Sequence, residues 1–184
     1  TAAVQATGAQ VSVLLVGAFD LLRAMEEAIA VGIRYLVTPT EGMPVHDALK
    51  AWKRCRETET VWIGASTPGM AIPGEVKLGF LPDDSLKPGP LGLMSKSGTL
   101  SYEAGYRLAQ RGVRTSVWVA VGGDPVKGTR FGPSPFFVLS GSAYLRTSPC
   151  GSREVFPGRR QSPGAGIMVS REAGDLHGLE AIPA

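Results

Sequence analysis

The chain has 184 residues, of which 43% are hydrophobic, and this is enough to build the core of one ordinary domain or of one and a half small ones. Its formal charge of +3, from 19 Lys and Arg against 16 Asp and Glu, is too small and too dispersed to indicate a nucleic-acid surface. No apolar run reaches the roughly 20 residues of a membrane span, and the first residues show no signal-peptide pattern. We therefore expect a soluble, cytoplasmic protein with neither a nucleic-acid nor a membrane partner.

Short strand-like runs alternate with helix-like stretches from residue 11 to residue 121, a pattern typical of parallel βα units and of a sheet covered on both faces. The predicted elements of the first half, in chain order, are a strand over 11–16, a helix over 20–31, a strand over 33–37, a helix over 45–56 and a strand over 61–63. The stretch 64–73 is so rich in Gly, Pro, Ser and Thr that we expect a loop there.

The second half restarts the same pattern, with a strand over 91–94, a helix over 100–111 and a strand over 115–121. We expect two incomplete α/β lobes, 1–80 and 91–131, joined by a Pro- and Gly-punctuated linker over 81–90. Residues 132–184 hold no helical periodicity and are rich in Pro and Gly, which predicts a loop-rich tail.

The polar turn Ser95–Thr99 lies between an expected strand and an expected helix. Such a turn leaves the first amides of the helix without backbone partners and directs the positive end of the helix dipole toward a ligand. Phosphate or carboxylate is the ligand that this arrangement predicts. Capping of the helix by Ser97 or Thr99 explains the same residues equally well, and both interpretations stay open.

Ligands of open α/β sheets bind outside the carboxyl ends of the strands, so the loops after each strand are the candidate site. Small residues and backbone amides dominate four of these loops, which suits a nucleotide, a pantetheine arm or a phosphate. Glu41 could accept a hydrogen bond from such a ligand or cap the helix that begins near Val45. The four loops are Thr38–Pro44, Gly64–Gly69, Ser95–Thr99 and Gly122–Pro125.

These loops, in this order and at these spacings, resemble the alpha subunit of succinate-CoA ligase, also called succinyl-CoA synthetase. The corresponding family motifs are Ile-Thr-Glu-Gly-Ile-Pro, Gly-Pro-Asn-Cys/Thr-Pro-Gly, Ser-Arg-Ser-Gly-Thr-Leu-Thr-Tyr-Glu and Gly-Gly-Asp-Pro. The resemblance covers about residues 11–131. It implies a Rossmann-like, parallel-sheet lobe that binds coenzyme A, followed by a flavodoxin-like ligase lobe, and an acid-thiol ligase of the tricarboxylic acid cycle.

The resemblance also implies roles for single residues. Pro39, Thr40 and Glu41 fall where the family contacts coenzyme A. A second group falls near the thiol end of that cofactor and the carboxylate to be activated: Ser66, Thr67 and Pro68, with Ser66 in place of the usual Asn.

The third group belongs to the polar turn and the helix after it. Ser97, Gly98 and Thr99 match the helix N-terminus that holds a phosphorylated histidine, which agrees with the anion site expected from the turn alone. Tyr102 matches a tyrosine at the contact with substrate and beta subunit. Lys96 stands where Arg is usual, which keeps the charge but loses a bidentate fork, and a merely solvated Lys explains it as well.

The catalytic histidine of the family is not found in this chain. That histidine lies in a Gly-His-Ala-Gly-Ala motif, and its nearest counterpart here, Gly158–Gly166, contains none. The family's Gly-Glu-Ile-Gly-Gly segment is absent as well, and its Gly-rich coenzyme A loop would precede Thr1. His46 is typical of an exposed helix residue and His177 lies outside any family motif, so we assign no catalytic residue.

Three explanations of the missing histidine stay open: an out-of-frame tail after Phe131, a noncatalytic pseudo-subunit that binds a beta subunit or acyl-CoA, and a different acyl-CoA chemistry. The primary interpretation is a partial alpha subunit that forms succinyl-CoA or a related acyl-CoA with reduced activity. The resemblance implies an ATP-grasp beta subunit as partner, with ATP or GTP and Mg²⁺ bound there, and a small carboxylate as substrate. Cys55 and Cys150 are isolated, so we expect neither a disulfide framework nor a metal site.

Overall fold

The structure is a computed structural model that describes residues 2–129 and 166–169. His177, Cys150 and most of the expected tail lie outside the described residues. The elements, in chain order, are α1 (Ala2–Thr7), β1 (Val11–Val13), α2 (Leu21–Ala30), β2 (Tyr35–Thr38), α3 (Val45–Glu57), β3 (Val61–Gly64), β4 (Gly69–Ile72), β5 (Val76–Gly79), the short 3₁₀ helix η1 (Asp83–Ser85), β6 (Pro88–Ser95), α4 (Gly98–Gln110), β7 (Thr115–Ala120) and β8 (Gly166–Val169). The predicted α/β class, with its parallel strands, is confirmed.

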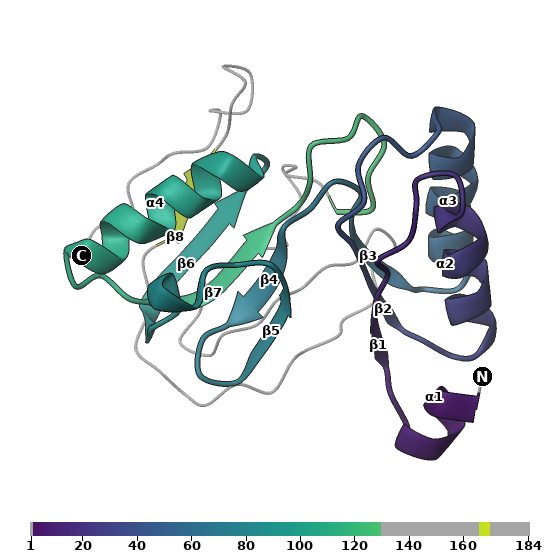
Figure 1. The fold of residues 1–184 in the computed structure, drawn as a ribbon, viewed down its shortest axis with the longest axis horizontal. Coiled ribbons are helices and arrows are strands. Elements are labelled where there is room, and N and C mark those ends of the chain that lie inside the picture. Colours follow the sequence, from purple (N-terminus) through teal and green to yellow (C-terminus); the bar gives the residue numbers. More distant parts are fainter. Residues whose placement is uncertain (1, 130–165, 170–184) are drawn as a thin grey trace.

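The first sheet has the order β1-β2-β3 and is parallel throughout. Its two crossover helices, α2 and α3, lie side by side on one face, as right-handed connections in one direction require (Figure 1). Leu21, Met25 and Ile29 recur at helical spacing on the buried side of α2. They pack in one core cluster with Leu36 and Trp62 of the sheet.

The second sheet has the order β5-β4-β7-β6-β8, with β6 parallel to β7 and to β8. The expected loop over 64–73 is wrong in part, because Gly69–Ile72 forms β4. This strand pairs antiparallel with β5 and with β7, where Met70 lies opposite Val119. The described strand Gly166–Val169 likewise falls inside the stretch expected to be a loop-rich tail.

The two sheets pack against each other through a shared core. Val37, Val61 and Ile63 of the first sheet belong to one buried cluster with Met70 and Val119 of the second. Because side chains alternate along a strand, the neighbours of these residues point to the outer faces. Each sheet is thus covered on both faces, with the other sheet on one face and helix on the other (Figure 1).

The outer face of the second sheet is covered by α4. Trp118 of β7 is fully buried there, in a cluster with Ala71, Leu81 and Leu93. A Cβ atom at Gly105 of α4 would overlap with the Trp118 ring. The absence of a side chain at this position therefore allows the helix to lie close to the sheet.

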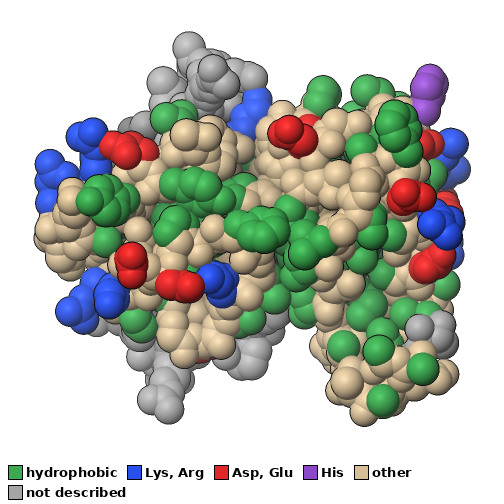
Figure 2. Space-filling model, in the orientation of Figure 1, with side chains coloured by type: hydrophobic (Ala, Val, Ile, Leu, Met, Phe, Trp, Pro, Cys, Tyr) green, Lys and Arg blue, Asp and Glu red, His purple; other side chains and the backbone are tan. Residues whose placement is uncertain are grey.

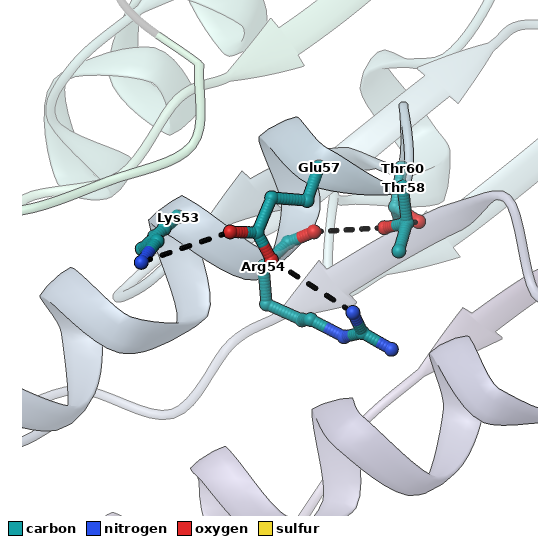
Figure 3. Close-up of polar contacts among 5 residues, drawn as sticks. All are labelled: Lys53, Arg54, Glu57, Thr58 and Thr60. Carbon is teal, nitrogen blue, oxygen red and sulfur yellow. Dashed lines mark hydrogen bonds and ion pairs between the residues drawn. The ribbon is translucent and has the colours of Figure 1, made fainter.

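Several polar contacts gather at the C-terminal end of α3 (Figure 3). Glu57 faces Lys53 Nζ and Arg54 Nη1, both at 3.8 Å. Thr58 donates its hydroxyl to the carbonyl of Arg54 at 2.9 Å and lies 2.9 Å from the hydroxyl of Thr60. Exposed pairs of this kind contribute at most about 1 kcal/mol each, so the buried face of α3 dominates its stability.

Charged side chains of both signs are interspersed over the visible face of the molecule, and hydrophobic side chains gather across its middle (Figure 2). This face therefore shows no large patch of a single sign. None of the helices in the described parts of the chain is long and apolar enough to cross a membrane.

Candidate functional site

The loops after the parallel strands meet at the carboxyl ends of those strands. We call residues 39–44, 64–68, 95–99 and 122–129 the loop cluster. Thr40, in the loop after β2, is hydrogen-bonded to two other segments. Its hydroxyl donates to the Val16 carbonyl at 2.6 Å, and its carbonyl accepts from Ser66 N at 2.9 Å. The loop after β2 is thus hydrogen-bonded to the loop after β3.

The segment after β7 runs back along the loop between β3 and β4. Gly123 N donates to the Ser66 carbonyl at 3.1 Å, and Gly128 N donates to the Gly64 carbonyl at 2.9 Å. A Cβ atom at Gly122 would overlap with the Ala65 carbonyl oxygen. Only a residue without a side chain permits this approach of two backbones.

Thr67 and Pro68 lie inside the loop cluster rather than at its surface. Thr67 is 2% exposed; its hydroxyl donates to the Ala120 carbonyl and accepts from Gly69 N at 2.9 Å. Pro68 is buried and lies 3.4 Å from the position that a Cβ atom of Gly98 would occupy. Ser66, by contrast, is partly exposed. Of these three expected contacts, Ser66 is the one that a ligand can reach most directly.

The turn before α4 brings the helix N-terminus next to Pro68. Ser97 is the N-cap, and its hydroxyl accepts from Leu100 N at 3.4 Å, so the capping interpretation is confirmed. Ser95 supports the turn by donating to the Ser97 carbonyl at 2.7 Å. Capping uses the amide of the third helical residue, which leaves those of Gly98 and Thr99 as the donors for an anion. Anion binding itself stays a prediction.

Pro39 and Thr40 are partly exposed at the end of β2, and Glu41 is exposed. The N-cap of α3 is Pro44, and Glu41 forms no hydrogen bond with another described residue. The capping role considered for Glu41 is therefore not seen. Its carboxylate is oriented neither by the helix nor by a basic partner among these residues.

Tyr102 lies on α4 and packs against the cluster around Trp118. Burial raises the pKa of its phenol, so the group stays protonated at neutral pH. The ring is thus partly committed to the core, and only its remaining surface can serve the substrate or partner contact that the resemblance implies.

The described histidine and cysteine both belong to α3. His46 is exposed at the start of α3, as expected. Burial raises the pKa of the Cys55 thiol to about 12, which keeps it protonated and unreactive at neutral pH. Across residues 2–129 and 166–169, no group of three His, Cys, Asp or Glu side chains could hold a metal ion.

Sequence reasoning missed two side chains that organise the loop cluster. Asp124 accepts from Gly42 N at 3.2 Å, and Lys127, 9% exposed, donates to the Gly122 carbonyl at 2.9 Å. The Gly-Gly-Asp-Pro motif identified the segment that contains Asp124, but it did not predict the hydrogen bond of Asp124 with Gly42 N. A single Lys in a loop gave no sign of burial.

The fold and the loop cluster define an α/β protein with a candidate ligand site at the carboxyl ends of its parallel strands. Over 129 residues the chain is 42% identical to the succinate-CoA ligase [ADP-forming] subunit alpha 2 of Archaeoglobus fulgidus, with 70% of this chain and 45% of that protein covered. Over 128 residues it is 41% identical to the corresponding alpha subunit of Aquifex aeolicus, covering 68% and 42%. The malate-CoA ligase subunit alpha of Methylorubrum extorquens is 35% identical over 133 residues, covering 70% and 45%.

Among solved structures, the chain is similar to the ATP citrate lyase of Methanothrix soehngenii in complex with citrate and coenzyme A, with a TM-score of 0.63 and 25% identity over 70% of this chain and 22% of that chain. No protein-family profile matches the chain. The chain is a partial relative of the alpha subunits of succinate-CoA ligase, as its loop motifs predicted. It spans less than half the length of the curated relatives that it matches.

Proposed function

We propose that the chain serves as the alpha-subunit component of a carboxylate-CoA ligase, which forms succinyl-CoA or a related acyl-CoA from a carboxylate, coenzyme A and ATP or GTP. The observation that carries this proposal is the hydrogen-bonded meeting of the Thr40, Ser66 and Gly123 backbones. The names of the relatives, succinate-CoA and malate-CoA ligase alpha subunits, support the ligand class.

The chemistry of the first two loops fits coenzyme A. Pro39, Thr40 and Ser66 are small and partly exposed, so backbone groups can approach a ligand closely, and Glu41 adds an exposed acceptor for a ligand hydroxyl or amide. Thr67 and Pro68 would hold the shape of the second loop from inside. Bound coenzyme A would supply the thiol that receives the acyl group.

The turn before α4 fits a phosphoryl group. Ser97 caps the helix, and the amides of Gly98 and Thr99 sit at the positive end of its dipole, where an anion is stabilised. Tyr102 follows one turn later and would contact the substrate or the beta subunit with its exposed part. We place ATP or GTP and Mg²⁺ on an ATP-grasp beta subunit, the proposed partner.

The second candidate is a noncatalytic pseudo-subunit that binds a beta subunit or acyl-CoA without turnover. The observation in its favour is the lack of a histidine in Gly158–Gly166, where the resemblance expects one. The two candidates differ in phosphoryl transfer, which only the catalytic alpha subunit performs.

Phosphoryl transfer is tested by incubating the 184-residue chain with the beta subunit of the same organism, Mg²⁺ and γ-labelled ATP or GTP. Acid-labile label on the chain, located by mass spectrometry, supports the catalytic alpha subunit. Label at His46 or His177 would contradict our assignment of no catalytic histidine. Retained beta-subunit binding without label supports the pseudo-subunit.

Ligand binding is tested by titrating coenzyme A calorimetrically into the wild type and into Glu41→Gln. Losing the charged acceptor is expected to weaken binding about tenfold, close to the effect of one hydrogen bond to a charged group. Glu75→Gln, at an exposed residue in the turn after β4, is the matched control and should bind like the wild type. Wild-type protein that binds no coenzyme A would refute the catalytic alpha subunit and would leave only a pseudo-subunit that binds a beta subunit.

A further inference from the structure

The amide of Gly42 is held by a side chain 82 positions later in the chain. Asp124 Oδ2 accepts from Gly42 N at 3.2 Å, which connects the loop after β2 to the segment after β7. Gly42 is exposed, and nothing lies within 4 Å of the position that its Cβ atom would occupy. Packing therefore does little to fix this peptide, and the hydrogen bond carries that role.

Asp124 itself sits on a well-anchored segment. Its neighbour Gly123 donates to the Ser66 carbonyl at 3.1 Å. The buried Lys127 donates to the Gly122 carbonyl at 2.9 Å, which closes the segment on itself. The Asp124 carboxylate thus extends from backbone that is already attached to the loop between β3 and β4.

The loop after β2 has one anchor on each side of its exposed part. Thr40 is bound to Val16 and Ser66, and the buried Met43 packs in the core cluster of α2 and α3. Glu41 and Gly42 lie between Thr40 and Met43, and the hydrogen bond from Gly42 N to Asp124 fixes this exposed part of the loop. Loss of its hydrogen bond would free the Glu41 carboxylate to move relative to Ser66.

We infer that Asp124 is a positioning residue, which fixes Glu41 and Gly42 against the loop of Ser66 so that one ligand can reach both. The ligand in question is coenzyme A, and this part rests on the function proposed above.

The test separates the acceptor from the charge. Asp124→Ala removes both, whereas Asp124→Asn keeps an acceptor oxygen and removes the charge. Hydrogen–deuterium exchange at Gly42 N is the readout that is independent of any ligand. We expect exchange about tenfold faster in Asp124→Ala and within about twofold of wild type in Asp124→Asn, because the opening of one loop contact is local.

Two controls accompany these variants. Asp83→Ala removes an exposed carboxylate that pairs with Lys77 at 2.6 Å, far along the chain from Gly42, and should leave Gly42 exchange unchanged. Val121 N, bound to the Ser95 carbonyl at 2.8 Å, reports whether the fold is intact. If Val121 N also exchanges faster in Asp124→Ala, that variant disturbs the fold, and Asp124→Glu is used in its place. Asp124→Glu keeps the charge but misplaces the carboxylate, so it should also speed exchange at Gly42 N.

The inference is overturned if Gly42 N exchanges at the wild-type rate in Asp124→Ala, or in Asp124→Glu where that variant replaces it. It is also overturned if Gly42 N exchanges as fast in Asp124→Asn as in Asp124→Ala. Coenzyme A affinity is then measured on the same proteins, with an expected tenfold loss for Asp124→Ala and less than twofold for Asp124→Asn. Unchanged affinity in Asp124→Ala overturns the positioning of Glu41. If exchange follows the expectation but wild-type protein binds no coenzyme A, the proposed function fails while the hold of Asp124 on Gly42 is supported.

Discussion

Ser66 combines a side chain with a backbone conformation that does not favour it. Its φ is +59°, in the left-handed region, which costs an L-residue about 1–2 kcal/mol. Asn tolerates this region better because its side chain bonds locally to the backbone. We predict that Ser66→Asn raises the free energy of unfolding by about 0.5–1 kcal/mol, measured by urea denaturation.

Glu59 provides a comparison outside the loop cluster. It is exposed, follows α3 and has a φ of +54°. Glu59→Asn should therefore stabilise the protein by a similar amount. If Glu59→Asn raises the free energy of unfolding but Ser66→Asn lowers it, the Ser66 side chain makes contacts in its loop that outweigh the conformational benefit of Asn.

Single residues of the site were predictable from sequence to different degrees. Ser97 was predictable as a cap, because a Ser directly before a helix can satisfy a free amide through local geometry alone. Asp124 was not predictable as the partner of Gly42, because the contact spans 82 positions and depends on how two loops meet. Local patterns identify the segments that carry a site, whereas packing of the sheets decides which side chains face each other.

The packing of α4 depends on one residue without a side chain. Gly105→Ala would improve the intrinsic helix propensity by about 0.5–1 kcal/mol. The added Cβ would overlap with the fully buried Trp118 ring, and overpacking a core typically costs about 1–3 kcal/mol. We predict a net loss of about 1–2 kcal/mol in the free energy of unfolding, measured by urea denaturation.

Gly98 is the matched position on the same helix. A Cβ atom there would lie 3.4 Å from Pro68, which is an ordinary contact distance. Gly98→Ala should thus change the stability by less than about 0.5 kcal/mol. A similar loss in both variants would place the cost in the helix itself and would contradict the role given to Trp118.

The elements with a clear local signal were predictable, and those defined by pairing were not. The helix Val45–Glu57 and the strand Val61–Gly64 lie within a residue of their predicted ends, because the buried residues of the helix follow helical spacing and the strand is a short apolar run that is buried throughout. The Gly- and Pro-flanked β4 has neither signal and is a strand because β5 and β7 pair with it. Pairing between distant segments overrides weak local propensity, so sequence pattern alone assigned it to a loop.

At the scale of the whole molecule, the cluster between the sheets bears on the division into two lobes. Val37 and Ile63 of the first sheet share this buried core with Met94 and Val119 of the second. The division into lobes 1–80 and 91–131, with a linker over 81–90, stays a prediction from the sequence. A shared core predicts that the sheets fold as one cooperative unit wherever that boundary lies.

Met25→Ala tests this cooperativity without touching the second sheet, because Met25 is fully buried between α2 and the first sheet. Truncating a buried Met costs about 2–5 kcal/mol. If the sheets form one unit, native-state hydrogen exchange should show the same decrease in opening free energy for amides of β2 and of β7, because both open only through global unfolding. A decrease confined to the first sheet would show that β6 and β7 are stable on their own, and the buried cluster that holds Ile63 and Val119 would then be an interface between two independent lobes.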